Sequence, residues 1–465
     1  MSVLGTRTRL GYSLGSFVTG AFGTVPGLLL LPYLTDTLAV PAAAAGAIVL
    51  LPKAWDVVFN PVAGRLSDAD LVRRGSRVRS LVLGGLALAV TFAALFAHPG
   101  FGGVGADSAY VVAVFFLCAT AFAFFQVPFN ALPAELTDGY HERTRLTTWR
   151  IAVLALAILT SGAVAPAIAN GVGGVGGYRI MGLFVAALIV LGTVAVVVGI
   201  RGARVGRPKQ PTPTWRELLS TMRRWRSFRL LLGVYFVQAL GVATLLAAVS
   251  YVARYVLGDA DLQPLLFAGF VGPALLVMPL WDRVGRSGGK LTGFRVATVA
   301  LAAALFGLAF ARMLPTAPVF VLVALAGVGY AGIQVFPLAL LPDLITEEEH
   351  RTGEARAGVT AGVWTAAEAL GLALGPSLFG LVLSFGGYVS STDAAAAQPE
   401  SAVSAITFGF SVVPAMLVLL GLPLLRRTFF GSERGRGGGH GEGATSAGNG
   451  DDGGDEEGTE QVVGA

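Results

Sequence analysis

The segment VPAAAAGAIVLLPKAWDVVFNPVAGRLSD, residues 40–68, decides the fold class of this 465-residue chain. Its first part is an apolar run, and about 20 mostly apolar residues cross a bilayer as one helix. Charged and amide side chains interrupt the second part of the run, before Gly-Arg closes it. An ionisable group at membrane depth is expensive, so such a group is a functional candidate by default. The segment therefore predicts a membrane helix that carries function.

The composition of the whole chain agrees with a membrane location. Only 13% of the residues are charged and 54% are hydrophobic, whereas a soluble globular protein has about 25% charged residues. The 63 glycines are also in excess, and glycine lets membrane helices approach closely. These values exclude an ordinary soluble enzyme, a nucleic-acid binder and a disordered scaffold.

Similar apolar runs recur along the chain in two groups of six. They lie near residues 11–34, 40–60, 80–98, 108–131, 149–170, 179–200, 229–257, 263–282, 291–312, 316–342, 357–385 and 403–425. The sequence thus predicts an N-terminal six-helix half, 1–200, a central loop, 201–228, with a short surface helix after Pro213, and a C-terminal half, 229–430. The Gly-rich acidic tail, 431–465, has too few large apolar residues to offset its chain entropy and is predicted to be disordered.

The charges of the loops predict the orientation. Lys and Arg of short loops stay on the cytoplasmic side. The 60–79 and 201–228 loops are rich in arginine, whereas 35–40, 98–108, 258–263 and 386–402 contain neither Lys nor Arg. We therefore expect both termini in the cytoplasm and a multi-pass protein of the cell membrane. The net charge of +5 then reflects topology and requires no nucleic-acid partner.

Two halves of six spans joined by a long loop resemble the major facilitator fold. An acid near a helix end, followed by basic residues, occurs after the second span and again after the eighth. The residues are Asp68, Arg73 and Arg74 in the first copy, and Asp282, Arg283 and Arg286 in the second. The resemblance implies an all-α integral membrane protein with twelve helices, in which these charges clasp neighbouring helices at the cytoplasmic face.

The second span holds the candidate cation-coupling residues. Lys53, Asp56 and Asn60 are three and four residues apart, so they share one helical face. A carboxylate there can bind a cation or a proton, and Lys53 can neutralise it when the site is empty. The alternative is a structural ion pair in which Asp56 only compensates Lys53.

Candidate substrate-binding residues lie on the fourth and fifth spans. Gln126 and Asn130 are four apart and suited to hydrogen-bonding a polar ligand. Arg150 opens the fifth span, where it binds an anionic or hydroxyl-rich ligand or extends to the interface.

Three more candidates lie in the second half. Glu368 is the acid of the eleventh span, which also carries Trp364. Glu368 could pair with the other half, relay a proton or face the cytoplasmic mouth. Gln238 in the seventh span either contacts substrate or bonds a neighbouring helix.

Several segments resemble the glycoside–pentoside–hexuronide:cation symporters. They are LGYSLGSF, TDTLAV, KAWDVVFNPVAGRLSD, VPFNALPAELTD with ERTRL and Arg150, and RTGEARAGVTAGVWTAAEALGLALGP. The resemblance covers residues 1–430 and implies the major facilitator fold and cation-coupled uptake, with sugars as the commonest substrates. The lysophospholipid symporters share this broader family.

Departures from the family's pattern change the expected chemistry. Asp56 matches the first acid of the family's cation site, but Asn60 replaces the second, and Phe59 and Ala123 replace oxygen ligands. The resemblance therefore favours a proton over sodium at Asp56. Acids that grip galactosides fall at Gly20 and Gln126, and the eleventh-span lysine falls at Ala369, so a galactoside is disfavoured.

The sequence predicts a secondary active transporter that imports a sugar, glycoside or related small solute with a proton or Na⁺, by alternating access. Alternatives are a transporter of lysolipids, other amphipaths or drugs, including a proton-coupled exporter, and a receptor or scaffold that has lost coupling. No catalytic grouping or metal cluster is evident, so we expect no enzyme activity and no cofactor. The expected partners are a small-molecule substrate and the bilayer, and we expect a monomer.

Overall fold

The computed structural model describes residues 5–137, 140–201, 225–352, 357–392 and 397–425. Within these ranges the regular structure is helical. Eleven helices there are long and apolar enough to cross a membrane, and the bent pair α10–α11 makes a twelfth. The predicted all-α membrane fold is thus confirmed. The expected surface helix after Pro213 and the acidic tail, 431–465, lie outside the described residues, and the orientation stays a prediction from loop charge.

The first half of the chain forms six spans, the first of which is built from several short pieces. Its elements are α1 (Thr6–Leu14), α2 (Ser16–Val25), η1 (Pro26–Leu30), η2 (Tyr33–Thr37), α3 (Ala42–Arg74), α4 (Val78–Phe96), α5 (Val104–Leu136), α6 (Tyr140–Val172) and α7 (Gly174–Ile200).

The second half repeats this plan with more interruptions. Its elements are α9 (Arg226–Tyr251), η3 (Val252–Val256), α10 (Leu262–Leu276), α11 (Met278–Gly288), α12 (Lys290–Gly307), η4 (Leu308–Phe310), α13 (Thr316–Thr352), α14 (Ala357–Phe385), α15 (Glu400–Phe410), α16 (Val412–Leu420) and η5 (Leu422–Leu424).

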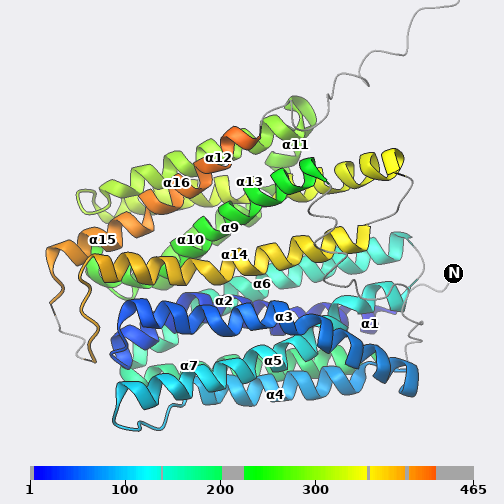
Figure 1. Ribbon diagram of the computed structural model, residues 1–465, viewed down its shortest axis with the longest axis horizontal. Coiled ribbons are helices and arrows are strands. Elements are labelled where there is room, and N and C mark those ends of the chain that lie inside the picture. The colour runs from blue at the N-terminus through cyan, green and yellow to red at the C-terminus, as the bar shows by residue number, and fades with distance from the viewer. Residues whose placement is uncertain (1–4, 138–139, 202–224, 353–356, 393–396, 426–465) are drawn as a thin grey trace, which may run out of the picture.

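The two halves form two layers that meet along α3 and α14 (Figure 1). The two backbones touch there, because a Cβ on Gly380 would lie 2.5 Å from the carbonyl oxygen of Ala42. The Ser377 hydroxyl donates to the Gly46 carbonyl oxygen across the same contact, at 2.7 Å. Small residues thus allow close packing at the interface between the halves.

The two ends of the bundle differ in their loops. We call the end with the segments 31–41, 257–261, 386–392 and 397–399 the clamp end, and the end where α1 begins and α3 stops the basic end. Loop charge predicts that the basic end is cytoplasmic.

Several helices differ in extent from the predicted spans, α3 and the α10–α11 pair most clearly. The expected span 40–60 is the apolar part of a longer helix, α3, which continues to Arg74 and ends at Gly75 with a φ of 67°. The expected span 263–282 is broken after Leu276, where α10 and α11 meet at 47°. Pro279 explains the break, because its ring clashes with the carbonyl group four residues earlier and lacks an N–H.

Candidate functional site

Arg150 organises a polar group in the N-terminal half. Its guanidinium donates to the Asn130 side-chain oxygen at 2.5 Å and lies 4.9 Å from the centroid of the Phe129 ring. The ring of Tyr12 stacks on Phe129 at 4.8 Å. Asn130 is exposed and Arg150 half-buried, so this group from α1, α5 and α6 can reach a ligand. The predicted residues Asn130 and Arg150 are therefore adjacent, and Tyr12 joins them.

Gln126 lies one helical turn before Asn130 on α5. Its side-chain oxygen is buried and has no hydrogen-bond partner among the described residues, whereas the buried hydroxyl of Tyr12 lies close to the Arg150 guanidinium. Tyr12 stands in the LGYSLGSF segment, so its position could have been singled out in the sequence. It was not singled out, because an aromatic residue in an apolar run is usually part of the core.

The three polar residues of α3 lie as the spacing predicts, on one helix, but Lys53 is directed to an aromatic ring. Its ammonium group lies 5.9 Å from the centroid of Phe22. Asp56 Oδ1 and Asn60 Oδ1 are buried without a hydrogen-bond partner among the described residues. Two unpartnered oxygens four residues apart on one face suit a proton or a cation, because oxygen ligands are what hard cations take.

Glu368 and Trp364 of α14 meet Tyr235 of α9. The Tyr235 hydroxyl donates to Glu368 Oε1 at 2.6 Å, and its ring stacks on Trp364 with centroids 4.3 Å apart. The indole N–H of Trp364 is buried beside the Tyr235 hydroxyl. Tyr235 was not among the predicted residues, although it lies three positions before Gln238. The aromatic pair and the carboxylate form the polar surface of the second half.

Gln238 is placed differently from the other candidates. It is 1% exposed, and its amide nitrogen donates to the Thr298 hydroxyl on α12 at 3.1 Å. Gln238 therefore bonds a neighbouring helix, which was the second of the two roles considered for it.

Three of the candidate residues carry buried polar atoms that have no hydrogen-bond partner within the described part of the chain. More than about 90% of buried polar groups in proteins have a partner, and an unsatisfied one costs about 1–3 kcal/mol. Among the described candidate residues, three such oxygens lie on α3 and α5, in the side chains of Asp56, Asn60 and Gln126. Atoms of this kind are satisfied by a ligand, an ion or water, so these three oxygens are available to a polar solute or a cation.

The acid Asp68 is bound to Arg77 rather than to Arg73 or Arg74. Arg77 donates to Asp68 Oδ1 at 2.6 Å, to both oxygens of Glu135 at 2.6–3.0 Å and to the Ser67 hydroxyl at 2.6 Å. Burial opposes its charge, but Glu135 and Asp68 together raise the pKa of Arg77. The cluster joins α3, the start of α4 and the end of α5, and only 2% of the Arg77 side chain is exposed.

The second half has a weaker counterpart of this cluster. Asp282 bonds Arg286 within α11, whereas the contact between helices is made by Lys290 of α12 and Asp343 of α13, at 2.5 Å. A repeat in the sequence could have revealed both acids. QVPFNALPAEL, 126–136, and QVFPLALLPDL, 334–344, align so that Glu135 matches Asp343.

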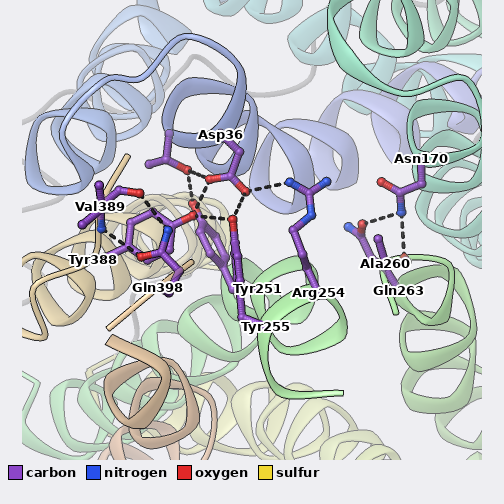
Figure 2. Close-up of polar contacts among 11 residues, drawn as sticks. Asp36, Asn170, Tyr251, Arg254, Tyr255, Ala260, Gln263, Tyr388, Val389 and Gln398 are labelled. Carbon is purple, nitrogen blue, oxygen red and sulfur yellow. Dashed lines mark hydrogen bonds and ion pairs between the residues drawn. The ribbon is translucent and has the colours of Figure 1, made fainter. Parts of the chain in front are cut away.

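A polar network, which we call the inter-half clamp, joins the halves at the clamp end (Figure 2). It centres on Asp36 of η2, which pairs with Arg254 of η3 at 3.0 Å and accepts hydrogen bonds from Tyr388 at 2.5 Å and Tyr255 at 3.3 Å. Thr35 and Tyr251 share a further hydrogen bond at 2.7 Å.

Both charged members of the clamp lie on π-helical turns. Such turns are rare and occur frequently at functional sites. A second contact of this end joins Asn170 of α6 to the carbonyl oxygen of Ala260 at 2.8 Å and to Gln263 at 3.2 Å (Figure 2). The clamp was not foreseen, because Asp36 lies in a loop-like segment, TDTLAV, whose partners are more than 200 residues away.

Comparisons with known proteins identify relatives along nearly the whole chain. Residues 11–430 match the family described as MFS/sugar transport protein. The glucuronide carrier protein homolog of Escherichia coli (strain K12) is 26% identical over 91% of this chain and 92% of that protein. The isoprimeverose transporter of Lactiplantibacillus pentosus is 23% identical over 91% and 88%. The sodium-dependent lysophosphatidylcholine symporter 1 of Mus musculus is also 23% identical, over 90% and 84%.

The overall fold is shared with solved transporter structures. The crystal structure of a D-xylose-proton symporter superposes with a TM-score of 0.61, covering 90% of this chain and 96% of that one. The sequence identity is 15%, so this likeness concerns the fold alone.

Proposed function

The chain belongs to the MFS/sugar transport protein family, and we propose that it couples the entry of a sugar, glycoside or related solute to a cation by alternating access. The resemblance to the glycoside–pentoside–hexuronide:cation symporters is thereby confirmed, and the chain is a membrane transporter rather than an enzyme. The buried side-chain oxygens of Asp56, Asn60 and Gln126, which have no hydrogen-bond partner among the described residues, carry the proposal.

We assign cation coupling to Asp56, with Asn60 beside it. Among the described residues no group of three His, Cys, Asp or Glu side chains is arranged to hold a metal ion. A proton needs one carboxylate, whereas Na⁺ needs several oxygens, so the donor set favours a proton. Protonation of Asp56 would change the relative stability of the two facing states and so link proton and solute movement.

We assign substrate recognition to two polar surfaces, one on each half. Gln126, Asn130 and Arg150 supply hydrogen bonds from the first half, and Trp364, with Tyr235 and Glu368, supplies an aromatic face and a carboxylate from the second. Aromatic faces with neighbouring polar groups suit ligands that are apolar on one side and hydroxylated at the edge. A lysolipid is the second candidate, because a lysophosphatidylcholine symporter is among the relatives.

The inter-half clamp supports alternating access. In this structure the halves are joined at the clamp end by Asp36–Arg254 and by the α3–α14 contact. We infer that the site communicates with the basic end in this state, and that breaking these contacts opens the opposite side.

The test uses purified protein in proteoliposomes. A thermal-shift screen of a methyl glucuronide, a methyl xyloside and lysophosphatidylcholine, each with and without Na⁺, selects the solute. Uptake is then driven by an imposed pH gradient or Na⁺ gradient.

We expect Asp56→Asn to abolish accumulation and to leave counterflow exchange intact, because the variant retains the site but cannot be protonated. Asp261→Asn removes an exposed loop acid and serves as the matched control. Unchanged accumulation by Asp56→Asn would rule out Asp56 as the coupling residue, and accumulation driven only by Na⁺ would rule out the proton.

A further inference from the structure

A groove of about 410 Å³ opens at the surface of the N-terminal half. It is formed by α3, α4 and α5 near the basic end, and α4 lies at the edge of the bundle furthest from the second half (Figure 1). Its walls are mainly apolar and include Leu66, Leu83, Ala87 and Phe124. Leu66 is 52% and Leu83 57% exposed, and exposed leucines on membrane-spanning helices are suited to contact the hydrocarbon of the bilayer.

Two arginines without partners stand in the same groove. Arg73 at the end of α3 and Arg79 at the start of α4 both line it, and neither has an ion pair or hydrogen bond within the described part of the chain. The acid of the groove, Asp70, is already neutralised. Its Oδ1 pairs with Arg74 at 3.5 Å, and its Oδ2 accepts a hydrogen bond from the Ser80 hydroxyl at 3.2 Å.

We propose that this groove binds an anionic phospholipid of the leaflet at the basic end. Arg73 and Arg79 hold its phosphate, and an acyl chain lies along Leu66, Leu83 and Phe124. Basic pockets between membrane helices on the cytoplasmic side bind anionic headgroups, and the charge here is complementary. An apolar wall facing hydrocarbon selects a lipid over a free phosphate, because only the lipid covers both parts of the groove.

A bound lipid would also stabilise the Arg77 cluster, which joins α3 to the start of α4. Ser80 and Asp70 link α3 to α4 inside the groove, and Arg77 lies between Arg74 and Arg79 in the same connection. We therefore expect an anionic lipid to raise the thermal unfolding temperature as well as to bind.

Native mass spectrometry of the full-length protein, titrated with phosphatidylglycerol or phosphatidylcholine, gives the affinity for the first lipid. Each basic residue near an anionic headgroup contributes about fivefold in affinity, so Arg73→Gln/Arg79→Gln should bind phosphatidylglycerol about 30-fold more weakly. The control Arg283→Gln/Arg286→Gln removes two arginines at the same end of the other half and should bind normally.

A second variant fills the groove and leaves the charges in place. Ala87 is exposed, so Ala87→Phe adds a ring without disturbing the core, and it should also weaken phosphatidylglycerol binding. Equal losses in the control pair, no loss in either groove variant, or equal affinity for phosphatidylcholine would each overturn the proposal. Full competition by millimolar inorganic phosphate would show a free-phosphate site and would likewise overturn it.

Discussion

At the scale of single residues, Arg77 has the largest predicted effect on stability. It is 2% exposed and bound to Glu135, which is 4% exposed. Removing one partner of a buried ion pair leaves the other charge without compensation and costs about 3–5 kcal/mol. We expect Arg77→Met to lower the thermal unfolding temperature of the purified protein strongly.

Arg74→Met is the control for this prediction. Arg74 is 56% exposed and lies 3.5 Å from Asp70, and an exposed pair contributes about 0–1 kcal/mol. The double variant Arg77→Met/Glu135→Leu should recover much of the loss, since it removes both charges. Similar unfolding temperatures for Arg77→Met and Arg74→Met would contradict the structural role of Arg77.

Single residues also show how much of the candidate site could be predicted from the sequence. Asp56, Asn60 and Gln126 were singled out because polar groups are rare in apolar runs, and all three carry a buried oxygen without a hydrogen-bond partner among the described residues. Tyr12 and Tyr235 were missed, because a tyrosine in an apolar helix is usually part of the core. Their roles depend on which ring and which carboxylate lie opposite, and that is decided by packing between distant helices.

At the scale of the elements, the close contact between α3 and α14 keeps the clamp end closed. A Cβ on Gly380 would lie 2.5 Å from the Ala42 carbonyl oxygen and 3.2 Å from Gly46 Cα. Overpacking costs about 1–3 kcal/mol. We expect Gly380→Val to separate the two helices and to shift the protein toward a state open at the clamp end.

Spin labels on Val172→Cys and Met313→Cys would report this opening as a longer distance between the halves. Both positions are exposed, at 55% and 84%, and the single native cysteine, Cys118, is buried and should not be labelled. Gly233→Val is the matched control, because a Cβ at Gly233 meets no atom within 4 Å. An unchanged distance distribution in Gly380→Val would contradict the prediction.

Helix ends show the limits of the sequence at this scale. Hydropathy located the spans, but it marked only 40–60 of α3, because the amphipathic segment up to Arg74 stays helical beyond the apolar run. The break between α10 and α11 was missed although Pro279 is visible in the sequence. Proline kinks are tolerated in membrane helices, so Pro279 alone does not predict a bend of 47°.

At the scale of the whole molecule, the inter-half clamp decides which side is closed. Asp36 is 7% and Arg254 30% exposed, so the two partners are unequally buried. Arg254→Gln leaves a buried carboxylate unpaired, whereas Asp36→Asn leaves an arginine that water can reach. We therefore expect Arg254→Gln to shift the equilibrium toward the state open at the clamp end more than Asp36→Asn does. The shift should be about 1–3 kcal/mol and is read from the populations in the same spin-label measurement.

The double variant Asp36→Asn/Arg254→Gln should open the clamp end by less than the sum of the single variants, since the two residues act as a pair. Arg312→Gln breaks an exposed pair with Glu400 inside the second half and should have no effect on the distance. Strict additivity of the two clamp variants would show that the ion pair does not hold the halves together.

The Arg77–Glu135 pair of the first half is buried, whereas the Lys290–Asp343 pair of the second half is exposed. This difference in burial makes the first half the more rigid one. Arg77–Glu135 is 2–4% exposed, whereas Lys290 and Asp343 are 38% and 56% exposed, and the bend between α10 and α11 lies in the same half as the exposed pair. Local opening follows the weakest packed region. In hydrogen exchange we therefore expect backbone amides at the start of α12 to exchange faster than those at the start of α4. The N-terminal half would then move as a rigid body during the transport cycle, and the C-terminal half would change its internal conformation.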